Sequence, residues 1–164
     1  MSTARSLPPS PVLAQLLSEV TSTMLGVPFT AAEGDERVEL LCWRSAVLPI
    51  GSDEVLQVAL ASDEGGCALL GARMFQVELA EVDAAMIDDT LRELVNMTAG
   101  MIKRALGAEA ALGLPRIVSK SRPDAKPLGS WRRVLLRGSE QPVEMVLFVS
   151  EPERKANNER GEAA

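Results

Sequence analysis

The most regular pattern of apolar and polar positions lies between residues 83 and 107. Apolar side chains and one threonine recur there in steps of three and four, which places them on one face of an α-helix. Asp83 suits the N-cap and Gly107 the C-terminal stop of such a helix. The pattern therefore predicts a long amphipathic helix whose buried face contains Ile87, Leu91, Leu94, Val95, Thr98, Ile102, Ala105 and Leu106.

Shorter patterns predict the other elements. A helix is expected from Pro11 to about residue 25, because proline suits a first helical turn and Gly26 a C-terminal stop. The β-branched and apolar runs at 38–48 and 55–61 indicate a hairpin with Gly51-Ser52-Asp53-Glu54 as its turn, after a loop at 30–36. A short helix at about 67–76, an extended piece at 114–118, a polar loop at 119–130 and strands at 131–137 and 143–150 complete the chain.

This order of helix, two strands, two helices and three strands is typical of an α+β fold with a mixed or antiparallel sheet. We expect one domain at 11–150, with disordered tails at 1–10 and 151–164 that are rich in Pro and Ser or in charge. The segments 19–26 and 93–100 share a Glu, a polar residue three positions later and a Gly four further on. Two such helices packed on one sheet predict a pseudo-two-fold internal repeat.

Composition restricts the function. The 164 residues carry a formal net charge of −6, which argues against a nucleic-acid or anionic-membrane surface. No apolar run is long enough to cross a membrane, and the N-terminal residues lack the apolar core of a signal peptide, so we expect a cytoplasmic protein. The absence of histidine excludes Ser-His-Asp triads and His-ligated zinc, and the two cysteines, Cys42 and Cys67, are expected to be buried.

The remaining candidate chemistry lies on the polar stripe of the long helix, which reads Asp89, Glu93, Asn96, Gly100 and Lys103. Gly inside a helix costs about 1 kcal/mol relative to Ala, so its presence on an exposed stripe suggests that some other group comes close to the backbone there. An ordinary solvated stripe is the alternative interpretation. A metal cluster at Asp88, Asp89 and Glu93 is disfavoured, because Asp88 and Glu93 project from different faces.

The segment Glu93-Leu94-Val95-Asn96-Met97-Thr98-Ala99-Gly100 resembles the E-x-x-N-x-x-x-G helix signature of the CheX chemotaxis phosphatases, relatives of CheC. An Asp shortly before the Glu, at Asp88 or Asp89, and a strand that contains Pro115 after the helix extend the likeness. The resemblance implies a CheC/CheX-like fold and hydrolysis of the aspartyl-phosphate of a CheY-like response regulator.

The resemblance also assigns roles. Asn96 would hold a water in line with the phosphorus, Glu93 would bind the regulator through a lysine, and Asp89, Gly100 and Lys103 would contact the same partner. The protein would need no cofactor or metal of its own, since the receiver domain would supply Mg²⁺, and it would form a homodimer.

Helix 11–25 would carry a degenerate second site, in which Glu19 is retained and Ser22 replaces the amide. Two alternatives to the enzyme remain open. The same helix face could bind a receiver domain without hydrolysis, or the domain could be a scaffold whose polar stripe is only solvated.

Overall fold

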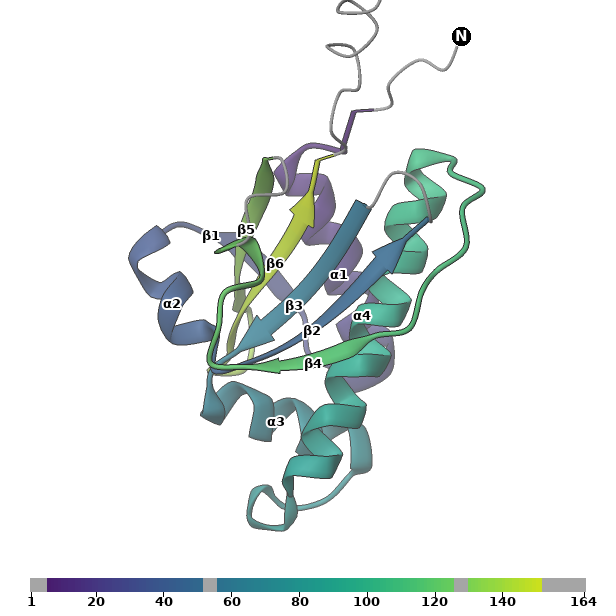
Figure 1. Ribbon diagram of the computed structural model, residues 1–164. Coiled ribbons are helices and arrows are strands. Elements are labelled where there is room, and N and C mark those ends of the chain that lie inside the picture. Colours follow the sequence, from purple (N-terminus) through teal and green to yellow (C-terminus); the bar gives the residue numbers. More distant parts are fainter. Residues whose placement is uncertain (1–5, 52–55, 126–129, 152–164) are drawn as a thin grey trace, which may run out of the picture.

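Two amphipathic helices dominate one side of the molecule (Figure 1). The computed structural model describes residues 6–51, 56–125 and 130–151. Helix α1 spans Ser10–Leu25 and ends at Gly26, whose left-handed backbone allows its N–H to bond the last turn. Helix α4 spans Ala84–Leu106. Its N-cap Asp83 accepts a hydrogen bond from the Met86 N–H at 2.9 Å, and Gly107 closes it in the left-handed conformation, as the sequence predicts.

The strands form one six-stranded antiparallel sheet in the order β1-β5-β6-β3-β2-β4. Its hairpins β2–β3 and β5–β6 are those that the sequence predicts, although the 52–55 turn lies outside the described residues. The strands are β1 Phe29–Ala32, β2 Arg44–Ile50, β3 Leu56–Ser62, β4 Arg116–Ser119, β5 Trp131–Gly138 and β6 Glu144–Ser150.

The sheet has the predicted pseudo-two-fold arrangement. Exchanging β1 with β4, β2 with β5 and β3 with β6 reverses the strand order and leaves every pairing intact. The axis therefore lies between β3 and β6, and each half gives its edge strand to the other half: β1 pairs with β5, and β4 pairs with β2. Trp43-Arg44 before one hairpin corresponds to Trp131-Arg132 at the other.

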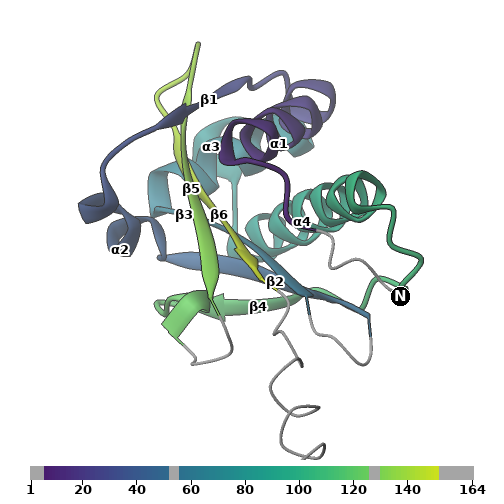
Figure 2. The same cartoon turned by 90° about the horizontal axis from the view of Figure 1, so that it is seen from above.

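Alternation along the strands divides the core into two layers. On β6, Met145, Leu147 and Val149 face the large cluster under α1, α4 and helix α3, Glu64–Phe75, whereas Val146 and Phe148 face the other side. The short helix α2, Val38–Leu41, covers part of that second side. Figure 2 shows α1 and α4 next to each other, away from α2.

Three local expectations were wrong. Residues 29–32 form edge strand β1 rather than part of a loop, and residues 38–41 form α2 rather than a strand, because Val38 and Leu41 are both buried one helical turn apart. Helix α3 begins at Glu64, because the Asp63 carboxylate caps it by accepting from the Gly66 N–H at 2.7 Å.

Leu7, which precedes the domain boundary expected at residue 11, is buried in the core. Three 3₁₀ turns connect the elements, at Asp35–Arg37, Leu79–Glu81 and Pro123–Ala125. Within the described part of the chain, no helix is both long and apolar enough to span a bilayer.

Candidate functional site

The exposed face of α4 carries the predicted site residues. The opposite face is buried as far as Ile102, whereas Ala105, which was expected on it, is exposed and Leu106 is half-buried. The threonines of this face, Thr90 and Thr98, satisfy their hydroxyls by donating to the carbonyls of Met86 and Leu94 at 2.8 and 2.7 Å. Glu93 and Asn96 are both exposed and are separated by three residues, so they lie side by side on the outer surface. The helix thus presents a carboxylate and a carboxamide together to solvent.

Both side chains are available to a partner. Among the described residues, neither the Asn96 carboxamide nor the Glu93 carboxylate has a hydrogen-bond or ion-pair partner. A carboxamide carries both a donor and an acceptor, and neither changes charge near neutral pH. The pair can therefore orient a small polar molecule and hold a cation without first breaking a contact within the protein.

The two aspartates before Glu93 have different environments. Asp88 faces the sheet, where its Oδ1 lies 2.6 Å from Nε of Arg44, and both side chains are only 21 % exposed. Asp89 points outward and lies 3.3 Å from Arg92, in a pair that is much more open to solvent. Only Asp89 can therefore belong to the outer surface, whereas Asp88 anchors α4 to β2.

Gly100 is half-buried, because the segment after α4 passes close to it. A Cβ at Gly100 would stand 4.0 Å from Cδ1 of Leu112, which is ordinary contact. Lys103 is half-buried one turn further on. The outer face of α4 is thus most open from Asp89 to Met97, which is 44 % exposed, and is partly covered beyond Gly100.

Arg44, Arg92 and Leu112 were not identified from the sequence. Arg92 could have been, because it precedes Asn96 by one helical turn and so shares its side of the helix. Arg44 and Leu112 reach α4 from other elements, and no spacing along the chain reveals such contacts.

The second copy of the motif lies on α1. Glu19 and Ser22 are both exposed there, at the same spacing as Glu93 and Asn96. The copy differs in chemistry, since the hydroxyl of Ser22 replaces the carboxamide of Asn96. The helix that follows it is also shorter, since α1 ends at Leu25 whereas α4 continues to Leu106. The structure therefore places both predicted sites on exposed helix faces and distinguishes them.

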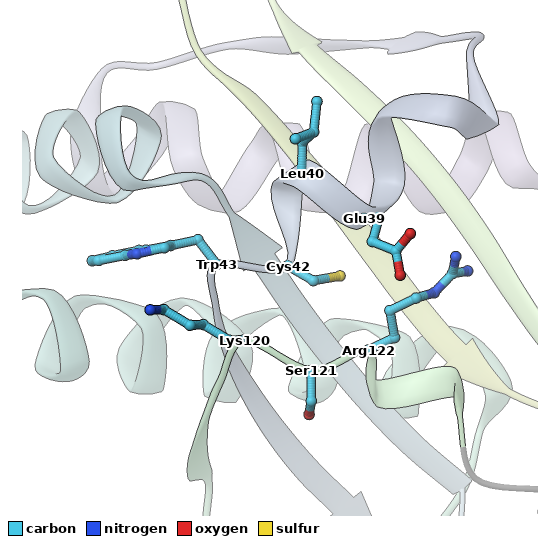
Figure 3. Close-up of a pocket in the computed structure, with 7 residues that line it drawn as sticks. All are labelled: Glu39, Leu40, Cys42, Trp43, Lys120, Ser121 and Arg122. Atoms are coloured by element: carbon cyan, nitrogen blue, oxygen red, sulfur yellow. The ribbon is translucent and has the colours of Figure 1, made fainter.

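A pocket of about 300 Å³ lies away from this face (Figure 3). Arg122 on its wall is held by Asp124 through two hydrogen bonds of 2.9 Å, and this pairing raises the pKa of Arg122. Burial raises the pKa of Cys42 to about 11, so its thiol is no ready nucleophile. The pocket is lined by Glu39, Leu40, Cys42, Trp43, Lys120, Ser121 and Arg122.

Cys67 is also buried, which raises the pKa of its thiol to about 12. In the described ranges, no three or more Asp, Glu, His or Cys side chains converge as metal ligands would. The candidate chemistry therefore lies on the convex surface of α4 rather than in a cavity, as suits a macromolecular substrate.

A family model described as chemotaxis phosphatase CheX matches residues 44–135, which include all of α4. This chain belongs to the CheX family. No curated protein matches the sequence. Among solved structures, the CheX-family chain is similar to chemotaxis protein CheX from Vibrio vulnificus, with a TM-score of 0.69, 18 % identity and coverage of 91 % of this chain and 99 % of that one.

Two further structures share the fold. A CheC-like superfamily protein from Shewanella aligns with a TM-score of 0.66 and 16 % identity over 87 % of this chain and 97 % of that one. A complex of CheX with CheY, BeF3 and Mg²⁺ from Borrelia burgdorferi aligns with a TM-score of 0.64 and 11 % identity over 84 % and 94 %. Identities this low establish only the fold, so the roles of the residues must be argued from the site itself.

Proposed function

We propose that this CheX-family protein hydrolyses the aspartyl-phosphate of a CheY-like receiver domain in chemotaxis or related two-component signalling. The observation that supports this most directly is the Asn96 carboxamide, which has no partner among the described residues and is exposed beside Glu93 on the convex face of α4. A convex helix can enter the concave active site of a partner protein. The complex of CheX with CheY from Borrelia burgdorferi supports a receiver domain as that partner.

Asn96 would position the attacking water. Its amide accepts one hydrogen bond from the water and donates another, which fixes the water in line with the phosphorus. The oxygen–phosphorus bond to the aspartyl carboxylate breaks as the new bond to water forms, and the products are the free carboxylate and inorganic phosphate. A loose, metaphosphate-like transition state needs little proton removal beforehand, so an amide suffices where a strong base is absent.

Glu93 would dock the receiver by pairing with a lysine in its active site. Asp89, Gly100 and Lys103 lie along the same helix and would extend the contact toward both ends. The receiver, and not this chain, would hold the Mg²⁺ that neutralises phosphoryl charge, since the described residues here form no metal-ligand cluster. The homodimer and the cytoplasmic location implied for the family remain predictions.

The test measures phosphate loss from Mg²⁺-loaded, phosphorylated receiver domains encoded in the same genome. Asn96→Ala is expected to lower the rate about 100-fold, as removal of one preorganised polar group does in other enzymes. Ser22→Ala on α1 is the matched control and should leave the rate unchanged. Equal rates for wild type and Asn96→Ala would contradict the catalytic role.

Binding separates the enzyme from a receiver-binding module. Affinity is measured with receivers loaded with BeF3 and Mg²⁺, where BeF3 mimics the phosphoryl group. Glu93→Gln is expected to raise Kd about tenfold or more, because the carboxamide keeps an acceptor oxygen but loses the negative charge that pairs with the lysine, whereas Glu19→Gln should not. Wild-type binding without acceleration of phosphate loss would support the non-catalytic module, and absence of binding to any receiver would support the scaffold.

A further inference from the structure

The segment that follows α4 is fixed to the sheet. The Gly51 N–H donates to the Ala111 carbonyl at 3.0 Å, and the Gly113 N–H donates to the Pro49 carbonyl at 2.7 Å. Gly113 is needed for this approach, since a Cβ there would stand 2.6 Å from Cγ of Pro49. Residues 111–113 therefore lie antiparallel beside the C-terminal end of β2, where Leu112 forms a bridge with Ile50.

This segment runs back along α4 on the flank that faces away from α1 (Figures 1 and 2). Leu112 lies over the helix at Gly100, where an added Cβ would stand 4.0 Å from its Cδ1. Two further residues of extended chain advance about 6.6 Å, and four residues of α-helix span about 6 Å. An extended course back along α4 would therefore bring Leu114 to the level of Asn96 along the helix axis.

Leu114 is the most exposed large apolar side chain in the described ranges, at 87 %. A single exposed leucine is unremarkable on a mobile loop. Here the preceding residues are hydrogen-bonded to β2 and the following residue is Pro115, which restricts the backbone of Leu114 to extended conformations. The backbone thus restrains Leu114 while its side chain is exposed to solvent.

Met97 provides a second apolar group, next to Asn96 on α4 and 44 % exposed. The Asn96 amide, which has no partner among the described residues, thus has an apolar side chain beside it on the helix, and the extended course of the neighbouring segment would bring Leu114 to the same level. Apolar contacts around a polar contact exclude bulk water from it and so strengthen it.

We propose that Leu114, with Met97, forms an apolar rim that packs on the receiver domain around its phosphorylated site and helps to select the cognate receiver. This inference rests on the proposed function for the identity of the partner. It extends the docking surface beyond α4 to a segment outside the E-x-x-N helix. The occupant is a receiver with an apolar patch beside its active site, because the rim is continuous with Glu93 and Asn96.

The test compares Leu114→Ser with wild type and with Leu40→Ser. Leu40 is a matched control, since it is 68 % exposed on α2, on the other side of the sheet. Affinity is measured for the receiver loaded with BeF3 and Mg²⁺, and phosphate loss is measured with saturating amounts of each variant. Leu114→Ser is expected to raise Kd about tenfold and to change the saturated rate by less than about twofold, whereas Leu40→Ser changes neither.

The outcomes distinguish this inference from the proposed function. An unchanged Kd for Leu114→Ser, with wild type active, overturns the rim and leaves the phosphatase intact. A raised Kd without phosphate loss by wild type supports the rim and overturns the catalysis. If sedimentation shows that Leu114→Ser separates a dimer without changing Kd, a second copy covers Leu114 and the rim is again overturned; if wild type binds no receiver, both proposals fail.

Discussion

Arg44 at the start of β2 holds Asp88 in the second turn of α4, with Nε 2.6 Å from Oδ1 and Nη2 donating to Oδ2 at 3.4 Å. The guanidinium also lies 5.7 Å from the centre of the Trp43 ring. This pair connects the sheet to the helix that carries Glu93 and Asn96, only five positions before Glu93 along α4.

Removing the Arg44 side chain is expected to destabilise the domain measurably. Arg44→Ala leaves Asp88 partly buried without its cation, so the free energy of unfolding should fall by about 1–2 kcal/mol, between the values for exposed and buried pairs. Urea unfolding measures this, and Arg92→Ala, which breaks the open pair with Asp89, should change the same free energy by less than about 0.5 kcal/mol. Equal losses for the two variants would contradict the anchoring role of Arg44.

Gly100→Ala is expected to raise the stability of the domain and to weaken its binding to the receiver. The added Cβ only makes ordinary contact with Leu112, and alanine is the better helix former, so the free energy of unfolding should rise by about 0.5–1 kcal/mol. Affinity for the BeF3-loaded receiver should fall, because the added methyl group would obstruct the approach to the backbone that we propose for the receiver at this position. A more stable variant with unchanged affinity would show that Gly100 is not a point of approach.

Ser22→Asn recreates the Glu-x-x-Asn pair on α1. When this change is added to Asn96→Ala, we expect the rate of phosphate loss to rise by less than about twofold over that of Asn96→Ala alone. The reason is that α1 ends at Leu25, so it lacks the turns that extend the surface of α4 past its amide. The same assay with Ser22→Ala is the control, and substantial recovery would mean that the amide alone was missing from the second site.

The sequence was sufficient where a segment's structure depends on its own residues. Helices α1 and α4 can be predicted from the helical spacing of their apolar residues, from a proline or an aspartate at the start and from a glycine at the end. The two hairpins follow from apolar runs separated by turn residues. The exposed positions of Glu93 and Asn96 follow from the same helical period that buries Leu94 and Val95.

The sequence was insufficient where the structure of a segment depends on contacts with residues far away in the chain. Four-residue β1 exists because it pairs with β5 and because the Phe29 N–H donates to the Ser18 hydroxyl at 3.0 Å. Helix α2 forms in a run with high strand propensity because Val38 and Leu41 bury against the sheet. The role of Asp88 depends on Arg44, from which it is separated by two strands and a helix.

The crossed pairing of the edge strands makes the two halves of the chain interdependent during folding. Strand β1 of the first half pairs with β5 of the second half, and β4 of the second half pairs with β2 of the first. Neither half can therefore pair all of its own strands by itself. Contacts of such long sequence separation slow folding and make it cooperative. The α1 half therefore supplies strand β1, without which β5 would have an unpaired edge, so the half that carries Ser22 in place of an amide is needed to build the sheet on which α4 packs.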